Sequence, residues 1–178
     1  MTTLLKEQLE NKKIITIIKI LLFMNLKYVN LYNNFIKLTT NKNLYKELKN
    51  QDTFEDRLNL FLIHFAFFLS VYKDKDNTKI LQEIYDLNFR HLELSIREIG
   101  YGDQSINKKM KDYINLFHHI LSDIHFWNNF DKLKKEKTLS NFLKNFNKTD
   151  DLTVYFDSFR ENLTKKTLNS YLKSVSNK

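Results

Sequence analysis

Histidine is the residue type with the most chemistry to offer in this chain. Three of the five histidines, His118, His119 and His125, lie close together in the sequence. On a helix, however, His118 and His125 would lie about two turns apart, and His118 and His119 would point about 100° apart. A chelate needs ligands that converge on one point. No Glu-x-x-His pair and no Cys occurs either, so we predict no metal site and no cofactor.

Catalytic groups are equally scattered. A Ser-His-Asp set can be assembled on paper from Ser95, His91 and Asp103, but no nucleophile-elbow motif surrounds the serine. The two glycines of the chain follow a predicted helix, and no Lys stands where a phosphate-binding loop requires one. The sequence therefore predicts a non-catalytic protein that has no small-molecule substrate.

The two glycines instead predict a corner between helices. Both lie in the segment Ile96-Arg97-Glu98-Ile99-Gly100-Tyr101-Gly102-Asp103. Gly100 is placed to close the preceding helix with a positive φ, and Asp103 to cap the next one. Arg97 can pair with Glu93 one turn earlier or bond to Asp103. A corner with no further role is the plainer interpretation.

Hydrophobic periodicity predicts the helices that position this corner. The first begins at a capping-box pattern of Thr53 and Asp56, and its apolar stripe comprises Leu58, Phe61, Leu62, Phe65, Phe68, Leu69 and Tyr72. The next two span about 78–99 and 104–127 and complete a three-helix core. Weaker patterns predict helices at 5–25, 27–40, 43–49, 131–146 and 151–174, with a frayed tail after Leu172.

Composition supports an all-α fold. The 178 residues include no Pro and two Gly, and 42% are hydrophobic, with 15 Phe and 9 Tyr. Such a chain can bury a substantial core but has few turn formers for β-structure. We predict a single compact multi-helix domain over residues 1–178, with a three-helix core and a Gly-x-Gly-Asp corner. The lack of Cys fits a reducing compartment, for which the cytoplasm is the simplest choice.

The net charge of +8 is unevenly distributed. Basic residues outnumber acidic ones by nine to three in residues 1–50 and by eleven to six in 131–178, while residues 51–130 have nine against twelve. Basic ends attract RNA or anionic lipid, although base composition alone could produce them. The apolar stretch from Ile14 to Met24 is too short and too charged to span a membrane. We predict an amphipathic helix that packs on the core or lies on a membrane surface.

The glycine segment resembles the Leu-Arg-Glu-Met-Gly-Val-Gly-Asp signature of the ubiquinol-cytochrome c chaperone family, the assembly factors for cytochrome b of the bc1 complex. The similarity covers roughly residues 30 to 127. Its further parts are Asp52-Thr53-Phe54 with Arg57 and His64, the segments Leu31-Tyr32 and Leu44-Tyr45, and the basic run from Lys108 to Lys111. The chain departs from the family pattern at Thr40, Lys42, Asp56, Leu92-Glu93 and His119-Ile120.

The resemblance implies a non-catalytic chaperone whose client is newly made cytochrome b. It implies partner-binding roles for Arg57, His64, Arg97, Glu98 and Asp103, and a structural role for Gly100 and Gly102. The basic ends would hold the protein near the ribosome or an anionic membrane, in the cytoplasm or at the inner membrane of a bacterium. The alternative is a basic helical module that binds RNA or anionic membrane surfaces.

Overall fold

The computed structural model describes residues 26, 28–100 and 102–176. Residues 28–39 are helical, and the elements that follow are η1 (Lys42–Tyr45), α2 (Phe54–Tyr72), α3 (Thr78–Glu98), α4 (Asp103–Asp123), η2 (Trp127–Asn129), α5 (Lys132–Phe142), α6 (Asp150–Thr164) and α7 (Leu168–Ser176). Over these residues there is no strand, only an isolated bridge between Leu48 and Phe146. The all-α prediction is confirmed. The predicted helix at 5–25 lies outside the described residues, so its inclusion in a single domain stays a prediction.

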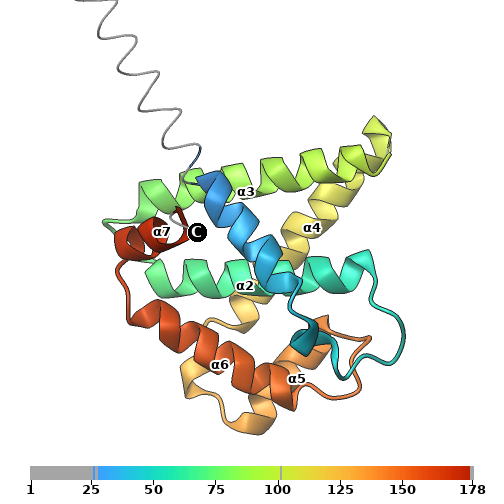
Figure 1. Cartoon of the computed structure of the whole chain (residues 1–178), viewed down its shortest axis with the longest axis vertical. Coiled ribbons are helices and arrows are strands. Elements are labelled where there is room, and N and C mark those ends of the chain that lie inside the picture. Colours follow the sequence, from blue (N-terminus) through green and yellow to red (C-terminus); the bar gives the residue numbers. More distant parts are fainter. Residues whose placement is uncertain (1–25, 27, 101, 177–178) are drawn as a thin grey trace, which may run out of the picture.

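α2 is the central helix, because its middle part has no exposed face. Every residue from Leu58 to Phe68 is buried, whereas the predicted stripe accounted for only one side of the helix. A helix that is apolar all round must be covered all round. In Figure 1, α2 runs across the middle of the molecule, with α3 on one side and α6 on the other.

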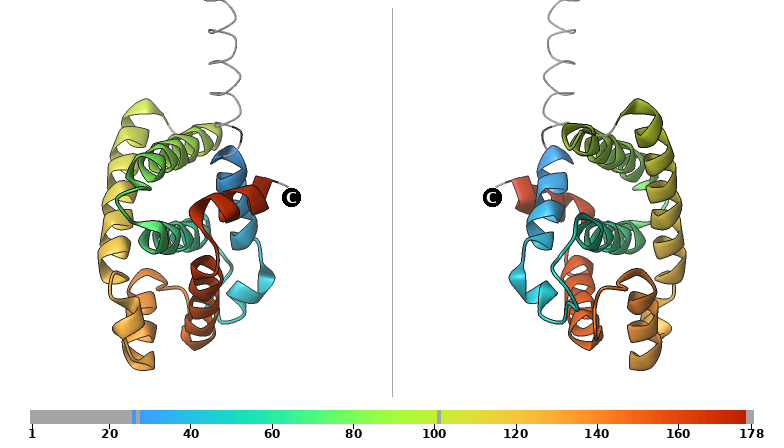
Figure 2. Two further views of the ribbon diagram at one scale, coloured as in Figure 1. Left: turned by 90° about the vertical axis from the view of Figure 1, so that its left-hand side faces the viewer. Right: turned by 90° about the vertical axis from the view of Figure 1, so that its right-hand side faces the viewer.

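Aromatic side chains join α2 to its neighbours. Phe65 stacks on Phe117 of α4 with ring centroids 5.0 Å apart, and Phe67 stacks on Phe156 of α6 at 5.3 Å. Phe35, from the helical residues 28–39, reaches Phe65 at 5.7 Å. Figure 2 shows α4 along one flank of the molecule and residues 28–39 on the opposite side of α2. The core therefore unites residues from both ends of the described chain.

The α3–α4 connection contains both glycines. α3 ends at Glu98, and Gly100 has φ 98°, a backbone conformation that residues other than glycine rarely adopt. α4 begins at Asp103, but its N-cap is Gly102, with φ −74°, and no side chain caps it. The prediction that Asp103 is the N-cap was wrong, because Asp103 is already the first helical residue. Only Gly100 has a backbone that requires glycine.

The chain around residues 43–49 is not the predicted helix. Asn41 caps the short η1 through a bond from the Asn43 backbone N–H to its Oδ1, at 3.1 Å. Leu48 then forms the bridge to Phe146. A residue paired with another segment in this way cannot continue a helix, so η1 ends after one turn.

The predicted helix at 151–174 is two helices. α6 ends at Thr164 and α7 begins at Leu168. Thr167 starts the new helix, since its Oγ1 accepts from the Ser170 backbone N–H at 3.2 Å, as an N-cap side chain does. Val175 is only 8% exposed. The prediction of a frayed tail after Leu172 was therefore wrong, because α7 continues and packs against the core.

The two glycines provide a matched pair for a stability test. We expect Gly100→Ser to destabilise the fold by about 1–2 kcal/mol, because a side chain at positive φ is strained. Gly102→Ser should be neutral or slightly stabilising, since Ser is a favoured N-cap and an added Cβ at Gly102 meets no atom within 4 Å. Urea unfolding followed by circular dichroism measures both. Equal losses for the two variants would contradict this assignment.

Candidate functional site

Arg97 is held between two carboxylates at the end of α3. Its Nε and Nη2 donate to Glu93 Oε1 at 3.1 and 2.7 Å, and its Nη1 pairs with Asp103 at the start of α4. We call Glu93, Arg97 and Asp103 the Arg97 triad. The Arg97 side chain is 39% exposed and that of Asp103 84% exposed. Because exposed ion pairs contribute little to stability, the main consequence is that the guanidinium has a defined place on the surface.

Exposed apolar side chains lie next to the triad in the sequence. Leu94 is 47% exposed and Ile99 58% exposed, and Glu98 is also exposed. Behind this surface, the Tyr32 hydroxyl and Ser95 Oγ are 3.2 Å apart, which fixes α3 to the helical residues 28–39. The end of α3 therefore presents charged and apolar groups together on a supported helix.

The structure does not bring all the predicted partner-binding residues together. Arg97 and Asp103 are in contact, and Glu98 follows Arg97 in the sequence and is exposed. Arg57, at the start of α2, pairs with Asp52: its Nε donates to Asp52 Oδ2 at 2.7 Å. His64 is fully buried, so it offers no surface to a partner. His64 is thus removed from the predicted surface patch, and a partner-binding role for the exposed Arg57 stays a prediction.

His64 is a core residue with both ring nitrogens bonded. Its Nδ1 lies 2.6 Å from the Leu60 carbonyl oxygen, which can only accept, so Nδ1 carries the proton. Its Nε2 lies 2.7 Å from the Tyr155 hydroxyl, which donates to it when the ring is neutral. Burial lowers the pKa of His64 to about 4, against an opposing effect of the Leu60 bond. His64 is therefore a neutral link between α2 and α6.

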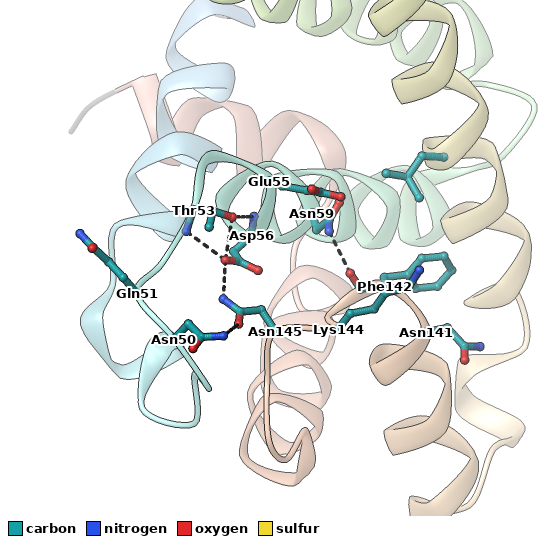
Figure 3. A pocket seen from close by; sticks show the side chains of 11 residues that line it. Asn50, Gln51, Thr53, Glu55, Asp56, Asn59, Asn141, Phe142, Lys144 and Asn145 are labelled. Atoms are coloured by element: carbon teal, nitrogen blue, oxygen red, sulfur yellow. Dashed lines mark hydrogen bonds between the residues drawn. The ribbon is translucent and has the colours of Figure 1, made fainter.

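A polar pocket of about 400 Å³ opens where α2 begins and α5 ends. One of the residues that line it is Asp56, which is 5% exposed. One oxygen, Oδ2, accepts from the Thr53 backbone N–H at 2.9 Å, from Thr53 Oγ1 at 2.8 Å and from Asn145 Nδ2 at 2.9 Å. Nearby, Asn59 Nδ2 donates to the Phe142 carbonyl at 2.9 Å. Figure 3 shows these bonds converging from two segments far apart in the sequence.

The Thr53–Asp56 capping box predicted from the sequence is confirmed. The contact with Asn145 was missed, because nothing local marks a residue that lies 89 positions away. Further bonds join the same segments: the Lys49 backbone N–H donates to the Asn145 carbonyl at 2.8 Å, and that of Asn147 to the Glu47 carbonyl at 2.7 Å. The stretch between residues 47 and 147 is therefore closed into a loop by its own ends.

The candidate catalytic and metal-binding residues have other partners. Ser95 Oγ donates to the His91 carbonyl rather than to its ring, at 3.0 Å, and Asp103 pairs with Arg97. His118 Nε2 lies 3.1 Å from the Tyr85 hydroxyl, while His119 lies 3.6 Å from Asp123. Within the part of the chain that the structure describes, no group of three or more His, Cys, Asp or Glu is arranged to hold a metal ion.

Comparison with known proteins identifies the family of the chain. The family model of the ubiquinol-cytochrome C chaperones matches residues 46–145. The protein therefore belongs to the ubiquinol-cytochrome c chaperone family. The match begins later than the expected resemblance and extends further, to Asn145 at the edge of the polar pocket. No curated protein and no solved structure matches the chain.

The matched segment coincides with the loop that the structure closes. Residues 46 and 145 lie at its two ends, where the main-chain bonds of Lys49 and Asn147 join the segments. Every residue for which the resemblance implied a role, from Arg57 to Asp103, lies inside the match. Of the helices in the described ranges, none is long and apolar enough to cross a membrane. Membership of the family implies a chaperone role in the assembly of the bc1 complex.

The buried His64 should make stability depend on pH. Its pKa of about 4 in the folded state lies below the ordinary value of about 6.5, so the unfolded state takes up a proton first as the pH falls. The contribution of the neutral His64 ring to the free energy of unfolding is complete above about pH 6.5. It decreases by about 3 kcal/mol as the pH falls to 4. Unfolding free energies of the wild type and His64→Gln, measured from pH 7 to 4, should converge by that amount. A constant difference would contradict the buried neutral ring.

The Asn145 bond to Asp56 can be tested by stability as well. Asn145→Ala should cost about 1–3 kcal/mol, because a buried carboxylate loses a donor. Asn141→Ala is the matched control: Asn141 lines the same pocket but is exposed, so its loss should cost less than about 0.5 kcal/mol. Chemical denaturation measures the loss of unfolding free energy in both variants. Equal losses would contradict a stabilising contribution from the bond between Asn145 and Asp56.

Proposed function

We propose that this protein is a non-catalytic assembly chaperone of the cytochrome bc1 complex and that its client is newly made cytochrome b. The observation that carries the proposal is the family match over residues 46–145. The fold agrees with a binding role, since Arg97 pairs with Asp103 on the surface and His64 is fully buried. A chaperone needs a surface that a client can reach and a scaffold that does not deform, and α2 with its covering helices supplies the scaffold.

The client-binding surface that we propose is the end of α3 with the start of α4. Between residues 93 and 103 it presents three carboxylates, those of Glu93, Glu98 and Asp103, against the single guanidinium of Arg97. Exposed Leu94 and Ile99 add apolar area. The loops of membrane proteins that stay on the cytoplasmic side are rich in Lys and Arg and border apolar segments. An acidic surface with apolar neighbours complements such a loop.

The remaining predicted residues have supporting roles in this proposal. Arg57 is exposed and paired with Asp52, and we assign it to a secondary contact at the start of α2. His64 holds α6 in place and acts on the client only through the fold. Gly100 allows α3 and α4 to meet, which places Asp103 beside Arg97.

The basic ends of the chain favour a place near anionic surfaces. In the described part of the C-terminal region, exposed lysines occur along α5 and after it, at Lys132, Lys134, Lys137, Lys144 and Lys148. We propose that they hold the protein at the ribosome or at the cytoplasmic face of the inner membrane. The same lysines favour a second candidate function, a module that binds RNA. Strong, salt-sensitive RNA binding together with normal bc1 content in a deletion strain would favour that alternative.

Deletion and complementation test the chaperone role. A strain that lacks the protein should contain much less cytochrome b and assembled bc1 complex, as measured by haem spectra and native gels of its membranes. The wild-type gene should restore both. Unchanged cytochrome b in the deletion strain would rule out the proposed function.

Charge reversal tests the proposed surface. Asp103→Lys should lower co-purification of cytochrome b about tenfold, because it removes one charge, adds the opposite one and releases Arg97. The matched control is Asp112→Lys, which makes the same charge change at an exposed position further along α4. Circular dichroism and urea unfolding of both variants establish that they are folded. If both variants retain cytochrome b equally well, the client binds elsewhere.

A further inference from the structure

A second pocket, of about 590 Å³, lies at the opposite end of α2 from the polar pocket. It forms where α2 ends and α3 begins, and the last part of α4 and Arg160 of α6 complete it. The connection between α2 and α3 lies at the left of Figure 1 and faces the viewer in the left panel of Figure 2. We call this site the Arg160 pocket. Pockets of about 300–1,000 Å³ are of the size that holds small molecules.

Three helices supply the apolar part of the Arg160 pocket. Leu69 comes from α2, Leu81 and Tyr85 from α3, and Leu121 from α4. The Tyr85 hydroxyl is engaged by His118 Nε2 at 3.1 Å, and burial raises the pKa of Tyr85, so this phenol stays neutral. These side chains therefore form an apolar wall that an aliphatic chain can contact.

Cationic side chains line the same pocket. Lys73 and Arg160 both face it, and no carboxylate of the described ranges forms an ion pair with either. Arg160 is half-buried, and burial lowers its pKa, against an opposing effect of Asp157. A partly desolvated guanidinium without an ion-pair partner is costly, and a bound anion would offset that cost.

The nearby carboxylates are already engaged. Asp157 accepts from Lys135 Nζ at 2.9 and 3.0 Å and from Trp127 Nε1 at 2.7 Å. Asp74, which also lines the pocket, accepts from the Asn77 backbone N–H and from Asn77 Nδ2, both at 2.9 Å. Because Asp157 and Asp74 already accept these bonds, they have less capacity to neutralise the positive charges of Arg160 and Lys73. The pocket thus combines an apolar wall with two cations that have anion-binding capacity left.

We propose that the Arg160 pocket binds an amphipathic anion, a single-chain molecule with a carboxylate or phosphate head and an aliphatic body. Arg160, whose planar guanidinium matches both head groups, and Lys73 would bind the head, and the chain would lie against Leu69, Leu81 and Leu121. Such molecules are a fatty acid or a lysophospholipid. The proposal is independent of the chaperone role, because the pocket lies away from the end of α3 and needs no protein client.

Calorimetric titration of the full chain tests the proposal. The probes are oleate and a lysophosphatidylglycerol, each below its critical micelle concentration, which distinguishes the carboxylate source from the phosphate source. Oleyl maltoside, which has a neutral head, and inorganic phosphate, which has no chain, are the comparison ligands. We expect at least one anionic amphiphile to bind, and both comparison ligands to bind at least tenfold more weakly.

Three variants locate the site. Arg160→Gln should weaken binding of the anionic probe about tenfold, the effect of losing one charge-assisted contact of about 1.4 kcal/mol. Leu121→Trp should weaken it by filling the apolar part. Lys165→Gln is the matched control: this cation is exposed, lies just after the same helix and does not line the pocket, so binding should be unchanged.

Several outcomes would overturn the proposal. They are no binding of either anionic amphiphile, equal binding of the neutral one or of phosphate alone, or the same affinity in Arg160→Gln and Lys165→Gln. Circular dichroism shows whether each variant is folded, and amide chemical shifts of the wild type show whether the probe acts at residues 69–85, 121–125 and 160. Cytochrome b content in the deletion strain is a separate readout, so failure here leaves the chaperone role untouched.

Discussion

The burial of α2 is the constraint on which the rest of the structure depends. Every residue from Leu58 to Phe68 is buried, so neighbours must cover this part of the helix on every side. α4 and α6 pack directly against it, and residues 28–39 add Phe35. Because the cover comes from segments before and after α2, removing one of them would expose apolar surface in the centre. The helices at the periphery are therefore parts of one core.

Two polar side chains that enter this core, those of His64 and Asp56, have partners across the fold. His64 bonds to its own helix and to Tyr155 of α6, and Asp56 accepts from Asn145. A buried polar group without a partner costs more than the net gain of a typical hydrogen bond, so these contacts favour the arrangement in which α2 meets α6 and the segment after α5. Two amide oxygens, Asn59 Oδ1 and Asn88 Oδ1, have no protein partner among the described residues.

The two sites that we propose lie at helix ends, because the helix bodies are occupied with packing. The Arg97 triad lies where α3 meets α4, and the Arg160 pocket lies where α2 meets α3. Both positions combine charged side chains with apolar ones on helices that share one core. A client protein and an amphipathic anion could thus be bound at the same time, since the two sites use different surfaces and different charges.

The sequence by itself determined the all-α class, the helices around the corner, the Thr53–Asp56 cap and the family. Each rests on local information: periodicity, composition, or residues within a few positions of one another. Only the tertiary structure decided that His64 is buried, that Asn145 reaches Asp56 and that Lys73 and Arg160 face one pocket. Helical periodicity shows which residues are apolar but not which helix covers them. The physical reason is that burial and long-range pairing are properties of assembled helices, and local spacing does not encode them.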